Sequence, residues 1–154
     1  MRSEAERKRV DELVRSLLVW RVSSVENELC HLVRQVSESD KLKVVEVLGA
    51  ANVRLAAAVA RRTHLAPVQQ AALLSRLLVN GGSNEIKYYV LGLFVYRLRA
   101  KVILGILHKN KESARSRVSL AAYYVLSSRR FNVEYKNALS GLARDKEGGV
   151  ENSR

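Results

Sequence analysis

The chain has 154 residues, enough to bury a sizeable hydrophobic core within one domain. It carries 27 Lys and Arg residues against 15 Asp and Glu residues, and this net charge of +12 favours a polyanionic partner. A single cysteine, Cys30, excludes an internal disulfide and a cysteine-based metal site, and the one Pro and eight Gly residues favour helix over sheet.

The first helical segment is predicted to begin near Ser3, because apolar residues recur at spacings of three and four as far as Val36. A capping-box pattern at Ser23 and Glu26 either restarts a helix or interrupts a continuous one, so the pattern allows one helix or two. Charges of both signs alternate on the outer face, which is typical of an exposed helix or of one that packs on a partner subunit. We therefore predict a helical arm over residues 1–36 whose candidate oligomer-interface residues are Val10, Leu13, Leu17 and Trp20.

Two further helices are predicted between residues 37 and 80. The polar segment 37–40 is a loop and cap, and the helix that follows it runs through Arg62. Its many Ala and Gly residues allow close approach to another helix or to a bulky ligand. Pro67 suits the first position of the next helix, and Asn80-Gly81-Gly82 ends it. These glycines are not a phosphate-cradling loop, because no strand precedes them and no GxxxxGK[ST] pattern follows.

The most apolar stretch, Ser83 to His108, is predicted to be one long core helix. Three cations within five residues follow its apolar run, and charges at that depth argue against a membrane span. At about 100° per residue, Arg97, Lys101 and His108 fall along one line of such a helix. We therefore expect most of its circumference to be buried and one ridge to be cationic.

The remaining helices are predicted from Glu112 or Ser113 to Ser127 and from Val133 to Ala143. The fold expected for the whole chain is all-α, with six to seven helices. It comprises the arm over 1–36, a compact helical bundle over 37–145 and a frayed polar tail over 146–154. No 34-residue period repeats along the chain, so tandem repeats are not predicted.

The basic residues are unevenly distributed along the chain. Residues 1–40 hold seven Lys and Arg against eight Asp and Glu, whereas the other 114 residues hold twenty against seven. Acids are absent over 47–84, 86–111 and 113–133, although a solvated surface usually mixes both signs. Arg outnumbers Lys eighteen to nine, and Arg binds phosphate oxygens in bidentate fashion. The pattern therefore indicates a basic face that contacts phosphates.

The candidate nucleic-acid contacts are basic residues of the acid-poor part of the chain: Arg54, Arg61, Arg62, Arg76, Arg97, Arg99, Lys101, Lys109, Lys111, Arg115, Arg117, Arg129 and Arg130. Tyr96, Tyr123 and Tyr124 lie near some of them in sequence, which suits stacking on single strands. No helix-turn-helix, homeodomain, zinc-finger or RRM signature is present. We therefore expect contacts to the backbone rather than to base edges, with little sequence preference.

The sequence contains no recognisable set of catalytic residues. The acids of the basic region are isolated, and no Ser/His/Asp or Cys/His arrangement is recognisable. His31, His64 and His108 lie far apart without metal-ligand spacing. We predict a protein that is not an enzyme and has no cofactor and no metal. Two classes then compete: many copies that coat nucleic acid, or a helical adaptor or small basic subunit of a larger protein or ribonucleoprotein complex.

One segment, SLAAYYVLSSRRFN at Ser119 to Asn132, places a Tyr-Tyr pair in a late helix before an aromatic-Asn turn. In this and in its helical arm, the chain resembles the small all-helical major capsid proteins of filamentous and rod-shaped archaeal viruses. The resemblance implies a structural protein that oligomerises around double-stranded DNA, favoured over RNA, in a virion nucleocapsid. It also implies self-association, with a paralogous subunit as one option. Without that resemblance, a cytoplasmic protein with no membrane span is expected.

Overall fold

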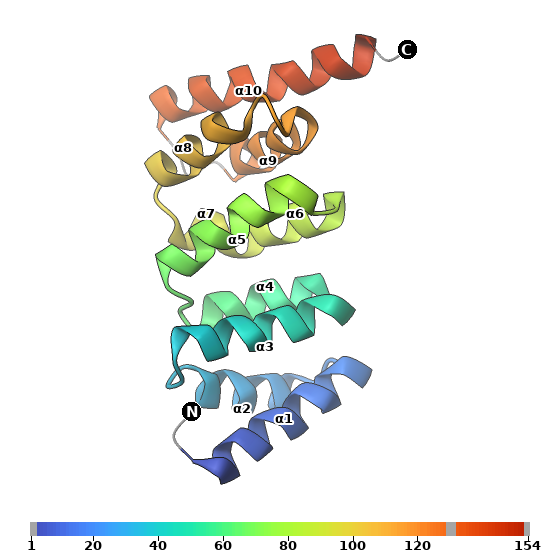
Figure 1. Ribbon diagram of the computed structural model, residues 1–154, viewed down its shortest axis with the longest axis vertical. Coiled ribbons are helices and arrows are strands. Elements are labelled where there is room, and N and C mark those ends of the chain that lie inside the picture. Colours follow the sequence, from blue (N-terminus) through green and yellow to red (C-terminus); the bar gives the residue numbers. More distant parts are fainter. Residues whose placement is uncertain (1–2, 129–131, 153–154) are drawn as a thin grey trace. The chain divides into compact units, whose positions relative to one another are not determined.

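The computed structural model of the protein describes residues 3–128 and 132–152, with side chains described as far as Ala143. Helices make up 83% of the structure and no strand occurs in the described residues, which confirms the all-α prediction (Figure 1). The described ranges contain nine helices when the continuous helix over 83–97 is counted once, more than the six or seven predicted. The chain forms two compact units, Met1–Gln69 and Gln70–Arg154, called here the N-terminal and C-terminal units.

The N-terminal unit is built from two helical hairpins. Its helices are α1 (Glu4–Val19), α2 (Ser23–Val33), α3 (Glu38–Ala51) and α4 (Val53–Arg62). Helix α1 packs against α2 and α3 against α4, and the hairpins meet through α1 with α3 and α2 with α4 (Figure 1). The buried apolar side chains between them form the core of this unit: Val10, Leu13, Leu17, Leu29, Val33, Val45, Leu48, Leu55 and Val59.

The predicted arm is part of this unit. Residues 3–36 form two helices, because Trp20 and Val22 adopt extended backbone between α1 and α2. Val10, Leu13 and Leu17, predicted as oligomer-interface residues, are only 2–3% exposed and belong to the core. The apolar stripe is real, but its spacing cannot tell a partner helix in the same chain from one in another copy. Of the predicted interface residues, Trp20 alone is exposed, at 75%.

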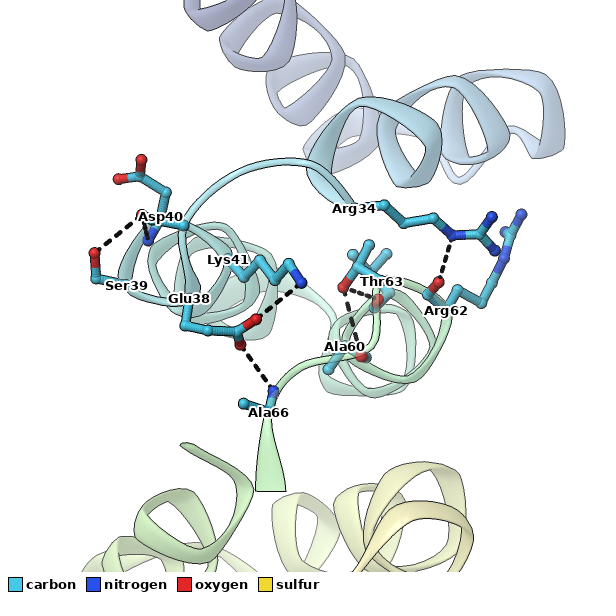
Figure 2. A network of polar contacts seen from close by, with 11 residues as sticks. Arg34, Glu38, Ser39, Asp40, Lys41, Ala60, Arg62, Thr63 and Ala66 are labelled. Atoms are coloured by element: carbon cyan, nitrogen blue, oxygen red, sulfur yellow. Dashed lines mark hydrogen bonds and ion pairs between the residues drawn. The ribbon is translucent and has the colours of Figure 1, made fainter. Parts of the chain in front are cut away.

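Polar contacts connect the start of α3 to the loop that follows α4 (Figure 2). The Glu38 carboxylate accepts a bond from Lys41 Nζ at 2.9 Å and one from the Ala66 backbone N–H at 2.8 Å. Ser37 caps α3 by accepting from the Asp40 N–H, and Arg34 Nε donates to the Arg62 carbonyl at 2.9 Å. These bonds hold the loops at one end of the two hairpins.

The C-terminal unit contains the remaining helices: α5 (Pro67–Asn80), α6 (Ser83–Tyr89), the π-turn η1 (Val90–Phe94), α7 (Val95–Arg97), α8 (Ala100–Asn110), α9 (Arg115–Ser127) and α10 (Val133–Asn152). Helix α9 packs against α6, η1, α8 and α10, and α10 also packs against α8 (Figure 1). The buried hydroxyl of Ser119 donates to the Leu142 carbonyl at 2.9 Å, which links α9 to α10. Helix α10 continues to Asn152, through most of the segment predicted as a frayed tail.

The long helix predicted from Ser83 to His108 is broken. It ends at Arg97, and Leu98 and Arg99 have extended backbone, with ψ of 139° and 143°, before α8 begins at Ala100. Leu98 is 6% exposed, so apolar burial continues through the break. The prediction is wrong because the apolar period runs on across these residues, whereas packing of α8 against α9 and α10 turns the chain.

The helices follow a regular spacing that the residue pattern does not show. Helices α1, α3, α5, α8 and α10 begin at residues 4, 38, 67, 100 and 133, which are intervals of 34, 29, 33 and 33 residues. Such intervals are typical of proteins built from helical hairpin repeats. The repeat therefore lies in the lengths of the helices and turns and not in residue identity.

Candidate nucleic-acid interface

The excess of basic residues lies mainly in the C-terminal unit. Residues 1–69 contain twelve Lys and Arg against nine Asp and Glu, and residues 70–154 contain fifteen against six. The N-terminal unit is therefore close to charge balance, with a net of +3, whereas the C-terminal unit has a net of +9. A polyanion would meet its strongest attraction on the C-terminal unit.

Seven of the predicted residues gather at the two ends of α8. The break cluster comprises Arg97, Arg99 and Lys101, all exposed, where α7 ends and α8 begins. The turn cluster comprises Lys109, Lys111, Arg115 and Arg117, where α8 ends and α9 begins. All of the turn cluster is exposed except Arg117, which is half-buried.

The two clusters are separated by the length of α8. Its eleven residues span about 16 Å at about 1.5 Å per residue. Successive phosphates of one DNA strand advance by about 3.4 Å along the axis. A strand that contacts both clusters would therefore extend over about five nucleotides. This arrangement replaces the single cationic ridge expected from an unbroken helix.

Each cluster combines cations at the end of one helix with cations at the start of the next: Arg99 and Lys101 lie at the N-terminus of α8, and Arg115 and Arg117 at that of α9. Helices α1 and α3 begin with capping serines and with acids in their first turns. Helices α8 and α9 have no side-chain cap bond and no acid in their first turns. A helix N-terminus carries a partial positive charge, so cations placed there repel it by about 0.3–1 kcal/mol each. Capping serines and acids therefore balance the partial positive charge at the N-termini of α1 and α3, whereas cations add to it at α8 and α9.

A hollow of about 690 Å³ opens beside the turn cluster. Its walls are the turn between α5 and α6 and the start of α9: Gly81, Gly82, Ser83, Ile86, Glu112, Ser113, Ala114, Arg115, Ser116, Arg117 and Leu120. Arg117 Nε donates to the Gly81 carbonyl at 2.9 Å, so its guanidinium is positioned against this wall. Gly81 is required there, because a Cβ would lie 2.6 Å from the Leu77 carbonyl oxygen. The hollow offers two arginines, three serines and one acid, Glu112.

The predicted residues outside α8 and its flanks that the structure describes lie on α4 and α5. Arg62 binds the buried carboxylate of Glu26 and the side chain of Asn27, so its guanidinium is engaged in the N-terminal unit. Arg54 and Arg61 also belong to α4 of the N-terminal unit, and Arg76 lies on α5. Arg129 and Arg130 lie outside the described residues.

The aromatic candidates are placed unequally. Tyr96 is 49% exposed beside Arg97, and Tyr123 is 57% exposed on α9. Tyr124 is half-buried and packs edge-to-face on Tyr123, with ring centroids 5.5 Å apart. Tyr96 therefore adjoins the break cluster. Sequence reasoning missed Gly81 and Ser116, because a helix-terminating glycine and an isolated serine carry no signal of a shared wall.

The described residues contain no group of three or more His, Cys, Asp or Glu side chains able to hold a metal ion. Burial raises the pKa of the Cys30 thiol, although the nearby Arg62 lowers it, so Cys30 stays protonated and weakly nucleophilic. Across the described ranges, every helix is too short or too polar to cross a membrane. Comparison of the chain with family models, curated proteins and solved structures found no match.

Proposed function

We propose that the C-terminal unit binds the sugar–phosphate backbone of a nucleic acid with little sequence preference. The observation that carries this proposal is the concentration of positive charge at α8 and α9, where clustered cations adjoin uncapped helix N-termini. A phosphate placed there would be stabilised by the side-chain charge, by the free backbone N–H groups and by the helix dipole together.

Each cluster has a distinct role in the proposal. The break cluster, with Tyr96 beside it, contacts one part of the backbone, and the turn cluster contacts another about five nucleotides away. The hollow beside the turn cluster accepts a phosphate between the start of α9 and the Gly81 turn. Base edges take no part, so affinity depends on charge and spacing and not on sequence. Double-stranded DNA remains the favoured ligand, as the resemblance to coat proteins implies.

Fluorescence anisotropy with a labelled duplex of arbitrary sequence tests this proposal. If about six phosphates are contacted, the logarithm of the association constant should fall against the logarithm of salt concentration with a slope near −5. A duplex of different sequence should give the same affinity within about threefold. A flat salt response would overturn the proposal.

Paired substitutions locate the interface. Arg97→Ala with Lys101→Ala, and separately Lys109→Ala with Arg115→Ala, should each reduce the steepness of the salt slope by about two. The matched control is Arg7→Ala with Lys8→Ala, which removes the same charge from exposed positions of α1. If the control pair weakens binding as much as the cluster pairs, the charge acts globally and the proposed interface is wrong.

A second candidate function is that of a helical adaptor in a larger complex. The hairpins of the N-terminal unit, with α1 on α3 and α2 on α4, favour it, because stacked helical hairpins commonly provide surfaces for other proteins. If the protein is an adaptor, its affinity for the duplex should not depend steeply on salt concentration. Neutralising the two clusters should then not weaken its binding to the partner protein. The anisotropy measurements therefore separate the two candidates.

A further inference from the structure

A shallow groove of about 300 Å³ lies between α1 and α3 of the N-terminal unit. Helix α1 contributes four residues that share one face and α3 contributes three: Asp11, Val14, Arg15, Leu18, Lys43, Val44 and Val47. Leu18 is 39% exposed and Val47 is 48% exposed, although both are large and apolar. The groove thus leaves two large apolar side chains uncovered on the surface of the N-terminal unit.

The apolar exposure continues past the groove at the end of α1. Val19 is 73% exposed, and Trp20, the only tryptophan of the chain, is 75% exposed. Isolated exposed apolar residues are common, but three consecutive ones, of which Leu18 lines an apolar groove, are typical of a surface that is covered by a partner. Tryptophan is also enriched among residues that anchor interfaces.

Three charged residues line the groove, Asp11, Arg15 and Lys43, and the Lys43 ammonium lies 3.9 Å from the Asp40 carboxylate. Asp11 and Arg15 lie one helical turn apart on α1. Both are exposed, and neither forms an ion pair with another described residue. When two copies of such a helix lie side by side in antiparallel directions, the Asp of each copy faces the Arg of the other.

We infer that this groove binds a second copy of the chain. The two copies pair through α1 with the helices antiparallel about a twofold axis. Asp11 of each copy then lies opposite Arg15 of the other, which gives two symmetric ion pairs. In that register Leu18 of each copy, three residues beyond Arg15, meets Lys8 of the other, three residues before Asp11. The aliphatic stem of Lys8 covers Leu18 beside Val47. Such a surface is self-complementary, as the interface of a twofold dimer must be.

Charge complementarity favours a second copy of the chain over other partners in the groove. Asp11 and the two exposed apolar side chains disfavour a nucleic acid, and an acidic partner would leave Asp11 without a cation. The N-terminal unit has a net charge of only +3, so pairing through it incurs little of the repulsion that a chain of net +12 otherwise feels. The inference needs no nucleic acid and holds or fails independently of the proposed function.

Light scattering during size-exclusion chromatography tests the mass of the full chain. The wild type, at concentrations on the order of 0.1 mM, should have about twice the 17.3 kDa of one copy. Leu18→Lys with Val47→Lys should give a single-copy mass, while its circular dichroism stays helical. The matched control is Val68→Lys with Val79→Lys, two valines exposed on α5 at 78% and 64%, and it should stay dimeric. A wild type of single-copy mass, or a control that dissociates equally, would overturn the inference.

Charge reversal then tests the predicted pairing. Asp11→Arg and Arg15→Asp should each dissociate, because like charges then meet across the axis. Mixing the two variants should restore a dimer, since the two arginines of one copy then face the two aspartates of the other. If each variant pairs as the wild type does, or the mixture stays monomeric, the antiparallel arrangement is wrong.

Discussion

The guanidinium of Arg62 lies 3.0 Å from the carboxylate of Glu26, which precedes it by 36 residues. Glu26 is 7% exposed, and Arg21 Nε binds the other oxygen of its carboxylate at 2.9 Å. Arg62 also donates to Asn27 Oδ1 at 2.6 Å. A buried carboxylate needs such partners, because burial without them disfavours its charged form. The contact joins α4 to α2 and thereby helps to hold the two hairpins of the N-terminal unit together.

Arg62→Ala should lower the free energy of unfolding by about 1–3 kcal/mol, because it leaves Glu26 with one partner fewer. The lower part of that range is expected, since the Arg62 side chain is 33% exposed and solvent screens the pair. Urea unfolding followed by circular dichroism measures the change, with Arg7→Ala as an exposed control. If Arg62→Ala leaves stability unchanged but weakens nucleic-acid binding, Arg62 belongs to the interface after all.

The case of Arg62 shows why the sequence cannot separate structural cations from surface ones. Arg62 and Arg97 both stand in acid-free tracts, so their local patterns are alike. Only the fold brings Glu26 to Arg62, whereas Arg97 stays exposed at the end of α7. Local signals predict some local features: Ser3 caps a helix and Pro67 begins one. The helix predicted to run unbroken through Arg62 is instead capped by Ser37 and divided at Asn52, which caps α4.

Features set by packing between helices are harder to predict from the sequence. The apolar stripe through Val10, Leu13 and Leu17 correctly predicts a helix, but its partner lies in the same chain. Likewise, the apolar period through Leu98 conceals the break between α7 and α8 at which the break cluster lies. The candidate residues can thus be chosen from charge pattern, but their grouping around α8 requires the tertiary structure.

Two glycines of the C-terminal unit should respond oppositely to the same substitution. Gly81→Ala should destabilise the protein by about 1–3 kcal/mol, because its Cβ would lie 2.6 Å from the Leu77 carbonyl oxygen. Gly105→Ala should stabilise it by about 0.5–1 kcal/mol, because Gly105 lies within α8 and a Cβ there meets nothing within 4 Å. Thermal unfolding of the two variants compares them directly. Equal effects would mean that the α5–α6 turn is built differently.

His64 occupies the left-handed region with φ of 58°, directly after the C-cap of α4. The His64 N–H donates to the Arg61 carbonyl and the Leu65 N–H to the Ala60 carbonyl, a helix ending that usually employs glycine. His64→Gly should raise the free energy of unfolding by about 0.5 kcal/mol, because relief of strain exceeds the added entropy of the unfolded chain. His64→Val should lower it by about 1 kcal/mol, since a branched Cβ tolerates this conformation poorly. Urea unfolding of both variants checks the order, and a valine variant as stable as the glycine variant would contradict it.

Glu38 should make the N-terminal unit sensitive to acid (Figure 2). Burial raises the pKa of its carboxyl, but bonds from the Ala66 N–H and Lys41 outweigh burial and hold the pKa below its ordinary value. A folded pKa below the unfolded value of about 4.3 means that the stabilisation is complete above that pH. It is lost as the pH falls through the folded pKa.

Glu38→Gln should therefore lower the free energy of unfolding at pH 7 by about 1 kcal/mol, because the 6% exposed Lys41 loses its counter-charge. The difference from the wild type should shrink as the pH falls through the lowered folded pKa of Glu38, because the wild-type carboxyl then becomes protonated as well. Glu4→Gln, an exposed acid of α1, should change stability by less than about 0.5 kcal/mol. Thermal unfolding at pH 7 and at successively lower pH measures all three proteins. A deficit of Glu38→Gln that persists unchanged down to the most acidic pH at which both proteins still fold would assign the effect to packing and not to charge.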